Sequence, residues 1–415
     1  MNDFQYKDGE LHAEDASLIE IAAQYSTPTF VYSSAAIKRS YQQFETAFAG
    51  QDHLICYAVK ANSNIGILGL LAGLGSGFDI VSGGELERVL VAGGDPNKII
   101  FSGVGKQAWE IEAALKAGIA CFNLESASEL QLISRSCSEL QKTARISVRV
   151  NPDVDPKTHP YIATGLKESK FGVSPGEALR IYEQANTIDC IEITGIDFHI
   201  GSQITELSPF TDALARVLEL VDELSDMGIE LKHIDLGGGI GITYKDEEPL
   251  HIDEYASCIS QMMAGRAYQL VFEPGRVIVG NAGILLSRVI TIKESEDTNF
   301  AVLDAAMNDL IRPALYQSWQ DIKNVRQTDK AESIYDVVGP ICESADFLAK
   351  NRSLALDEGD LVAIYSSGAY GFAMSSNYNS RSRAAELIVI GSDVHCVRKR
   401  ETFEDQIRLE TILPN

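Results

Sequence analysis

One lysine stands where a buried strand is expected to end. The segment CYAVKANSN places Lys60 directly after the apolar run Leu54 to Val59. A charged ammonium is expensive to bury there unless it is paired or used covalently, and a desolvated lysine loses its proton easily. The neutral amine is a nucleophile that can form a Schiff base with a carbonyl group. Taken alone, however, Lys60 is better explained as a strand-end lysine whose ammonium reaches solvent.

A glycine-rich segment could hold an anion. In HIDLGGGIG, residues 237–239 and Gly241 follow another expected strand, so backbone N–H groups could approach a phosphate with no Cβ in the way. The segment is not a dinucleotide-binding fingerprint, because the third glycine of G-x-G-x-x-G would fall on Ile242. A tight turn between a strand and a helix explains the glycines equally well.

Two further segments offer polar side chains at strand ends. In FEPGR, the carboxylate of Glu273 could keep a pyridine nitrogen protonated, and Arg276 offers a two-pronged donor to a carboxylate or phosphate. In DFHIGSQ, the ring of His199 could stack on an aromatic cofactor and the hydroxyl of Ser202 could reach a phosphate. A structural ion pair and a buried histidine bonded to a carbonyl group remain the alternatives.

The C-terminal third contains dense polar and glycine-rich clusters, which favour a site over a β core. NDLIRPALYQ contains Arg312 and Tyr316, GPICESADFLAK contains Cys342 and Glu343, and SSGAYGFAMSSNYN contains Tyr370. Because a neighbouring carboxylate disfavours the thiolate, we expect Cys342 to be a proton donor more readily than an ionised nucleophile.

Residues 36–280 predict a (β/α)₈ barrel. Eight short runs rich in β-branched residues alternate with amphipathic stretches such as Gly84 to Ala92 and Pro209 to Met227, which is typical of parallel βα units. The runs are Leu54 to Val59, Gly77 to Val81, Lys98 to Phe101, Ala120 to Leu124, Arg145 to Val150, Thr194 to His199, Lys232 to Leu236 and Gln269 to Glu273.

Nearly every run ends on a polar residue or a glycine, and barrels carry their chemistry at the carboxyl ends of their strands. We therefore expect one site at this end of the barrel. The end residues are Lys60, Ser82, Ser102, Glu125, Asn151, His199, Gly237 and Glu273.

The rest of the chain predicts a second, discontinuous domain, mainly of antiparallel β structure. After residue 280, apolar and polar residues alternate with few helical periods. The first 35 residues contain the run Thr29 to Tyr32, a strand that the barrel does not need. We assign residues 1–35 and 281–415 to this domain. Its other expected strands are Ile284 to Thr291, Phe300 to Leu303, Ser333 to Val338, Leu361 to Tyr365 and Ala384 to Ile390.

Composition excludes several classes of protein. The net charge of −24 disfavours nucleic-acid and anionic-membrane partners. No stretch approaches the ~18 apolar residues of a membrane span, and the first residues do not resemble a secretory signal, so we expect a cytoplasmic protein. The seven cysteines have no C-x-x-C spacing, which favours reduced, mostly buried thiols over disulfides or a metal site.

Taken together, these segments resemble the diaminopimelate decarboxylases, a family of pyridoxal-phosphate (PLP) enzymes with an alanine-racemase-like barrel and a β domain. The motifs that carry the resemblance occur in the family's order and span essentially the whole chain. They are CYAVKANSN, FDIVSGGELERVL, HIGSQ, GGGIG, EPGR, DLIRPALYQ, CESADFLAK and GAYGFAMSSNYNSR.

The resemblance implies a role for each matching barrel residue. Lys60 would form a Schiff base with PLP, His199 would stack against the ring, and Glu273 would contact the pyridine nitrogen. The other implied cofactor-binding residues are Asp79, Ser202, Gly237, Gly238, Gly239, Pro274, Gly275, Arg276 and Tyr370.

The resemblance also implies how a substrate is held. Arg276, Arg312 and Tyr316 would fix its distal carboxylate, Glu343 its distal ammonium, and Tyr370 would contact both cofactor and substrate. Whether Arg276 serves cofactor, substrate or both stays open.

A homodimer with shared active sites follows from the resemblance, because Cys342, the implied proton donor, and Glu343 reach the partner subunit's site in this family. One departure is visible: Ser382, in SRSRAAEL, replaces the family's usual proline, which puts the rigidity of that loop in doubt.

The implied reaction is the decarboxylation of meso-2,6-diaminopimelate to L-lysine and CO₂, the last step of lysine biosynthesis. An ornithine or arginine decarboxylase of the same group would need no partner for a distal carboxylate, and Arg312 with Arg276 argues against it. A racemase would want a tyrosine where Cys342 stands. A non-catalytic relative that binds a protein partner would be expected to lose Lys60 or Cys342, and both are present.

Overall fold

The computed structural model describes residues 3–155, 169–296 and 298–414. The chain divides into two compact units. The barrel unit comprises Arg39–Ile242 and Glu247–Ile278, and the β unit comprises Met1–Lys38, Thr243–Asp246 and Val279–Asn415. The four residues at 243–246 lie within the predicted barrel range but belong to the β unit.

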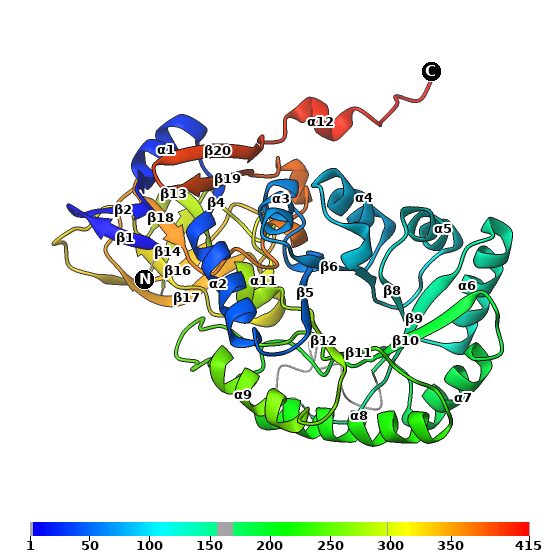
Figure 1. Ribbon diagram of the computed structural model, residues 1–415. Helices are drawn as coiled ribbons and strands as arrows, with labels where there is room; N and C mark the ends of the chain where they lie inside the picture. Colours follow the sequence, from blue (N-terminus) through cyan, green and yellow to red (C-terminus); the bar gives the residue numbers. More distant parts are fainter. Residues whose placement is uncertain (1–2, 156–168, 297, 415) are drawn as a thin grey trace. The chain divides into compact units, whose positions relative to one another are not determined.

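The predicted barrel is confirmed. Eight parallel strands pair in sequence order, and the eighth pairs with the first to close the barrel (Figure 1). Their positions match the eight predicted runs closely, because short runs of β-branched and aromatic residues are what a strand buried on both faces requires. The strands are β5 (His53–Ala58), β6 (Gly77–Ile80), β7 (Ile99–Phe101), β8 (Cys121–Leu124), β9 (Ala144–Arg149), β10 (Ile191–Asp197), β11 (His233–Asp235) and β12 (Gln269–Phe272).

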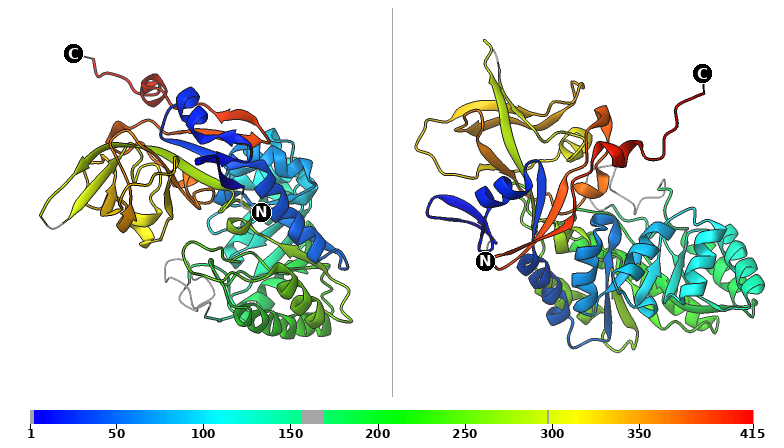
Figure 2. Two further views of the ribbon diagram at one scale, coloured as in Figure 1. Left: turned by 90° about the vertical axis from the view of Figure 1, so that its left-hand side faces the viewer. Right: turned by 90° about the horizontal axis from the view of Figure 1, so that it is seen from above.

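Helices surround these strands (Figures 1 and 2). Several begin at a serine whose Oγ accepts a hydrogen bond from the backbone N–H of a glutamate three residues later, as Ser82 and Ser126 do. The long helix α8 buries Leu214, Val217 and Val221 at helical spacing. The helices are α3 (Ile65–Gly73), α4 (Gly83–Val91), α5 (Ala108–Ala117), α6 (Ala127–Leu140), α7 (Pro175–Ala185), α8 (Ser208–Asp226), α9 (Ile252–Met262) and α10 (Arg276–Val279), with 3₁₀ turns η1 (Val59–Ala61) and η2 (Pro96–Lys98); α2 (Ser34–Ala47) precedes the barrel.

The β unit contains a nine-stranded, mainly antiparallel sheet, as predicted. The strand expected at Thr29 to Tyr32 is confirmed as β4 (Thr29–Ser33), which pairs with β13 on one side and β19 on the other. The remaining strands of this sheet are β13 (Gly283–Lys293), β14 (Asn299–Leu303), β15 (Ile322–Asn324), β16 (Ser333–Val338), β17 (Phe347–Leu354), β18 (Leu361–Ile364), β19 (Ala385–Ile390) and β20 (Asp393–Arg398).

An apolar core explains why the N-terminal segment belongs to this unit. Val31 of β4 is fully buried together with Leu286 of β13 and Leu387 of β19. The same core receives a small sheet and a helix that the sequence analysis did not resolve. These are β1 (Phe4–Lys7), β2 (Glu10–Ala13), β3 (Ala16–Ser17) and α1 (Leu18–Tyr25).

Short helices complete the β unit: α11 (Arg312–Tyr316), α12 (Phe403–Ile407), η4 (Phe372–Met374) and η5 (Tyr378–Ser380). Across the described residues, we find no helix with the length and apolarity that a membrane span requires.

Candidate active site

Backbone hydrogen bonds join the ends of neighbouring barrel strands. The N–H of Ala58, at the end of β5, donates to the carbonyl oxygen of Pro274 at 3.1 Å. The N–H of Glu273 donates to the carbonyl oxygen of Gly237 at 2.7 Å. The turn that carries Lys60, the EPGR segment and the glycine loop therefore lie side by side at the carboxyl end of the barrel.

Lys60 lies in η1, just beyond β5, and forms an ion pair. Its Nζ is 2.7 Å from Oδ2 of Asp79, the inward-facing residue of β6. The Lys60 side chain is 35% exposed, whereas that of Asp79 is fully buried. Lys60 is therefore paired, one of the ways in which the sequence analysis allows a lysine to be placed here, and a carboxylate at this distance stabilises the ammonium.

The glycine loop after β11 needs glycine for steric reasons. A Cβ on Gly238 would collide with the carbonyl oxygen of Glu273, and a Cβ on Gly239 would collide with that of Gly201. Gly239 also has a φ of +108°, which side chains rarely allow. Close backbone packing thus brings the ends of β10, β11 and β12 together around this loop.

His199 follows β10 and points toward the same loop. The N–H of Gly238 donates to Nδ1 of His199 at 3.1 Å, so the ring's own proton is on Nε2. Burial lowers the pKa of His199 well below its usual value, and the cations Arg149 and Lys60 lower it further. His199 is therefore a neutral ring, suited to stacking.

Ser202 and Arg276 are brought together as the sequence predicts. Nη2 of Arg276 donates to Oγ of Ser202 at 3.0 Å, and Arg276 is 7% exposed. Arg276 begins α10, directly after Pro274 and Gly275. A guanidinium and a hydroxyl thus lie between the strand ends of β10 and β12.

Glu273 belongs to a cluster of buried carboxyl groups inside the barrel. Carboxylate oxygens of Asp197, Asp235 and Glu273 lie within 4.8 Å of one another. Burial raises the pKa of Glu273 well above its ordinary value, and the charges of Asp235 and Asp79 raise it further. Burial also raises the pKa of Asp235 to about 7. The cluster therefore attracts protons and cations.

A hydrogen-bonded chain inside the barrel supports Glu273. Oγ of Ser102 donates to Oε1 of Glu273 at 3.1 Å and accepts from Nδ2 of Asn123 at 3.1 Å. Oγ of Ser147 in turn donates to Oδ1 of Asn123 at 2.6 Å. Asn123 and Ser147 were missed by the sequence analysis, although polar residues inside otherwise apolar strand runs were a usable signal.

Arg149 is a second residue that the sequence analysis missed. It is 7% exposed, its Nη1 is 3.0 Å from Oε1 of Glu125, and its Nε is 3.8 Å from Oδ2 of Asp197. Arg149 is thus a fixed cation beside the carboxyl cluster.

In the β unit, α11 places Arg312 against two aromatic rings. The guanidinium carbon is 4.7 Å from the ring centre of Tyr244 and 5.9 Å from that of Tyr316. Arg312 is 6% exposed. The sequence analysis did not single out Tyr244, which lies in the short segment that joins this unit from within the barrel range.

Cys342 and Glu343 lie on an exposed loop that is tied to η5. The N–H of Cys342 donates to Oδ1 of Asn379 at 2.7 Å, and the hydroxyl of Tyr378 donates to Oε2 of Glu343 at 3.1 Å. Both side chains are exposed. Tyr370 lies in the third predicted segment and has a φ of +56°, in the left-handed region that residues other than glycine seldom adopt.

Oγ of Ser382 accepts a hydrogen bond from Nε2 of Gln406 in α12 at 3.0 Å, so a contact with the C-terminal helix holds the loop where the family's proline is missing. The expectation of mostly buried cysteines is wrong, because several thiols lie on outward-facing positions such as Cys396 of the exposed strand β20. Cys56, Cys121 and Cys137 are buried, Cys190 and Cys258 are half-buried, Cys342 and Cys396 are exposed, and all seven are free.

Comparison with known proteins gives a consistent result. Residues 34–280 match the family model of the pyridoxal-dependent decarboxylase, pyridoxal binding domain. Diaminopimelate decarboxylase of Pseudomonas aeruginosa is 56% identical over 414 residues, with 100% of both chains covered.

Two solved structures share the fold along nearly the whole chain. Diaminopimelate decarboxylase from Helicobacter pylori, complexed with L-lysine, has a TM-score of 0.92 and 44% identity, with 95% of this chain and 99% of that chain covered. The enzyme from M. jannaschii, in co-complex with L-lysine, has a TM-score of 0.95 and 38% identity, with 100% and 98% covered.

Proposed function

Because this chain belongs to the pyridoxal-dependent decarboxylases, and within them to the diaminopimelate decarboxylases, we propose that it converts meso-2,6-diaminopimelate to L-lysine and CO₂. This reaction is the last step of lysine biosynthesis. The observation that carries the proposal is the position of Lys60: its amine is paired with Asp79 and lies on a turn hydrogen-bonded to the EPGR segment, which in turn contacts the glycine loop.

The barrel residues fit pyridoxal 5'-phosphate. Three buried carboxylate oxygens, Oδ1 of Asp79, Oδ1 of Asp197 and Oδ2 of Asp235, have no hydrogen-bond partner in the described part of the chain. Such a cluster favours a cationic guest, as a protonated pyridine nitrogen is. The glycine loop lies after the seventh barrel strand, where barrels commonly bind a phosphate. When bound, this cofactor supplies an electron sink for the pair left by the departing carboxylate.

Each barrel residue has a defined task under this proposal. Lys60 provides the amine that holds the cofactor's aldehyde carbon, and Asp79 takes and returns the proton of that amine. Glu273 pairs with the ring nitrogen, and neutral His199 covers a face of the ring. The phosphate is held by Ser202, Arg276 and the loop of Gly237, Gly238 and Gly239, while Pro274 and Gly275 fix the position of that loop through Glu273.

Residues of the β unit select the substrate. Buried Arg312 offers parallel N–H donors to a distal carboxylate, and Tyr316 adds a hydroxyl. Exposed Glu343 is suited to a distal ammonium. Cys342, next to it, gives a proton to the carbon that has lost CO₂, and Tyr370 contacts cofactor and substrate.

We also propose a homodimer in which each subunit completes its partner's site. Exposure of both Cys342 and Glu343 supports this, because residues that serve the subunit's own enclosed site would be expected to be buried. Exposed apolar side chains near the C-terminus offer further surface to bury: Phe403 is 61%, Leu409 is 83% and Ile412 is 92% exposed. Location in the cytoplasm stays a prediction from the sequence.

The covalent link tests the proposal directly. Protein incubated with pyridoxal phosphate should gain the visible absorbance of a Schiff base, and borohydride reduction followed by peptide mass mapping should place the label on Lys60. Lys60→Ala should abolish the absorbance. Lys116→Ala, which removes an exposed amine of α5, should leave it unchanged. A colourless wild-type protein, or a label on another lysine, would contradict the assignment.

Substrate choice needs its own measurement. Release of CO₂ from meso-2,6-diaminopimelate should exceed release from ornithine, arginine and lysine, because only the first offers a distal carboxylate to Arg312. Preference for a singly carboxylated amino acid would reject this substrate while leaving the covalent assignment intact.

A further inference from the structure

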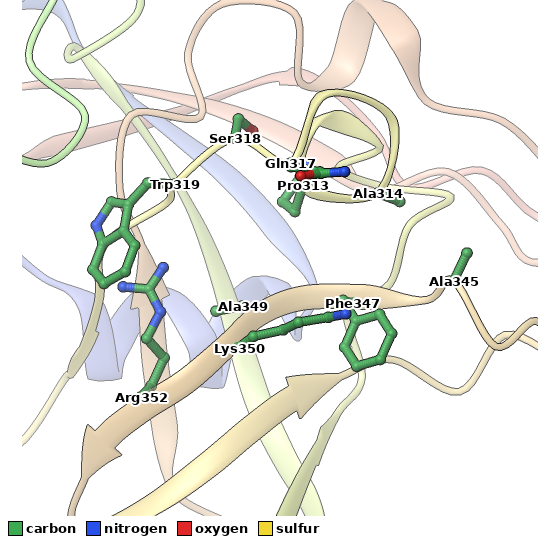
Figure 3. Close-up of a pocket in the computed structure, with 10 residues that line it drawn as sticks. All are labelled: Pro313, Ala314, Gln317, Ser318, Trp319, Ala345, Phe347, Ala349, Lys350 and Arg352. Atoms are coloured by element: carbon green, nitrogen blue, oxygen red, sulfur yellow. The ribbon is translucent and has the colours of Figure 1, made fainter.

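A pocket of about 450 Å³ lies in the β unit beside α11 and β17 (Figure 3). Neither Arg312 nor Tyr316 lines it, although both belong to α11. One wall comes from α11 and the loop that follows this helix. The other comes from β17 and from Ala345, which precedes this strand. The lining residues are Pro313, Ala314, Gln317, Ser318, Trp319, Ala345, Phe347, Ala349, Lys350 and Arg352.

The lining is cationic and aromatic. It contains Lys350 and Arg352 but no carboxylate, in a chain with 59 acidic and 35 basic residues. A third cation, Lys245, lies 4.9 Å above the ring of Trp319. The acidic residue nearest along the loop, Asp321, pairs with Lys323 at 3.5 Å. The pocket therefore has the opposite charge to the chain as a whole.

Arg352 is the buried charge of this pocket. It is 6% exposed and its guanidinium lies over the ring of Trp319, as Figure 3 shows. Nη2 donates to the carbonyl oxygen of Gln320 at 2.8 Å, but Nε has no partner among the described residues. No acidic side chain of the described residues lies within ion-pair distance of it. A buried guanidinium without a carboxylate is costly, and it is stabilised when an anion binds.

A β-bulge directs Arg352 into the pocket. In the pairing of β16 with β17, Val337 faces Ala349 but Tyr335 faces Arg352, so a single residue, Asp336, is opposite two residues of β17. Asn351, one of these two, has a φ of +51° and donates its N–H to Oδ1 of Asp336 at 2.8 Å. The bulge turns Arg352 to the same side as Ala349, and bulges of this kind often re-aim a side chain next to a site.

We propose that this pocket is a second binding site, for a small organic molecule that carries one oxyanion, a carboxylate or a phosphate, on a flat apolar body. The oxyanion pairs with Arg352 beside Trp319, and the flat body extends toward Phe347, over whose ring Nζ of Lys350 lies at 3.8 Å (Figure 3). Binding at this site does not depend on the reaction proposed above.

A regulatory consequence does rest on the proposed function. Pro313 and Ala314, which line the pocket, and Arg312 and Tyr316, which do not, all belong to the short helix α11. A molecule held against this helix shifts all four residues together, so we expect an occupied pocket to change the KM for the substrate.

Tryptophan fluorescence can test the site in the holoenzyme. The chain has two tryptophans, and Trp109→Phe leaves Trp319, in the pocket wall, as the only one. Benzoate and phenyl phosphate are the probes, and benzylamine is the matched cation. At least one anion should change the Trp319 emission saturably and benzylamine should not. A response to benzoate alone identifies a carboxylate site, and a tighter response to phenyl phosphate identifies a phosphate site.

Variants separate pocket binding from binding elsewhere. Arg352→Gln and the exposed Lys350→Gln should each weaken probe binding, Arg352→Gln by about tenfold or more. Lys116→Gln, on the barrel surface, should have no effect. The proposal is overturned if neither anion gives a saturable change in emission, or if both pocket variants bind the probes as well as the parent protein does. It is also overturned if dilution alone shifts the emission, because a second copy of the chain would then fill the pocket. Probe binding without any change in KM would reject only the regulatory consequence.

Discussion

Replacing Ser102 with alanine removes a buried hydrogen bond to Glu273 without touching the cofactor-binding residues themselves. The lost bond joins Oγ of Ser102 to Oε1 of Glu273 at 3.1 Å, and Nδ2 of Asn123 loses its acceptor as well. A hydrogen bond between neutral groups contributes about 0.5–1.5 kcal/mol, and an orphaned buried donor costs about 1–3 kcal/mol. We expect the free energy of unfolding to fall by about 2 kcal/mol, and the Kd of the cofactor to rise about tenfold because Glu273 is held less firmly.

Ser147→Ala is the matched control. Its Oγ donates to the other end of the same amide, Oδ1 of Asn123, at 2.6 Å, so its loss should destabilise the fold by a similar amount. Three hydrogen bonds separate Ser147 from Glu273, so the cofactor affinity should change less than threefold. Urea unfolding measures the first quantity, and titration of the apoprotein followed by visible absorbance measures the second. Equal losses of cofactor affinity in the two variants would refute the idea that Ser102 positions Glu273.

Three other predictions follow from single contacts. Burial, with Lys232 nearby, lowers the pKa of His233 from 6.5 to about 4. Between these pKa values the folded state binds fewer protons than the unfolded chain, so His233 should lower the free energy of unfolding by about 2 kcal/mol on going from pH ~8 to pH ~5. In urea unfolding, the stability of His233→Gln should therefore depend less steeply on pH than that of the wild type. An unchanged pH dependence would contradict this. Arg312→Lys should raise the KM for meso-2,6-diaminopimelate by about 10- to 100-fold with a smaller change in kcat, because a point charge replaces a two-pronged donor. Steady-state kinetics that show only a loss of kcat would mean that Arg312 does not bind the distal carboxylate. Mixing inactive Lys60→Ala and Cys342→Ala subunits should restore about a quarter of wild-type turnover, because about half of the dimers are then hybrids and each hybrid has one intact site out of two. No recovery of activity after subunit exchange would argue against shared active sites.

The barrel could be predicted from the sequence because its signal is local. Each strand is a short run of β-branched and aromatic residues, and the predicted run Gly77 to Val81 differs from β6 by a single residue. The polar residues at the strand ends then had to meet, since parallel strands that close a barrel bring their carboxyl ends to one side. Motif and geometry agree on Lys60, His199 and Glu273 for this reason.

Features that depend on pairing across the chain were not predicted. Strand β17 was missed because its sequence, FLAKNRSL, does not alternate regularly between apolar and polar residues. Its conformation depends on the partner β16 and on a bulge at Asn351. The partner of Lys60 could not be predicted, because Asp79 lies on another strand and a run of residues says nothing about which neighbours touch. The anion pocket was invisible for the same reason.

The carboxyl cluster explains why so much acid is buried at the core of this barrel. Asp79, Asp197, Asp235 and Glu273 are each at most 4% exposed, and the fixed cation Arg149 with the ammonium of Lys60 cannot balance all four charges. Without a further positive charge, the cluster must retain protons, which is the direction in which burial and mutual repulsion move the pKa values of Glu273, Asp197 and Asp235. A guest that brings a cationic ring nitrogen lets the cluster ionise. The attraction between the ionised carboxylates and this nitrogen then favours the protonated form of the ring over the neutral form. The same argument predicts that Asp235→Asn, which removes one of the charges, weakens cofactor binding more at high pH than at low pH. A loss of affinity that is independent of pH would show that the cluster acts through its shape alone.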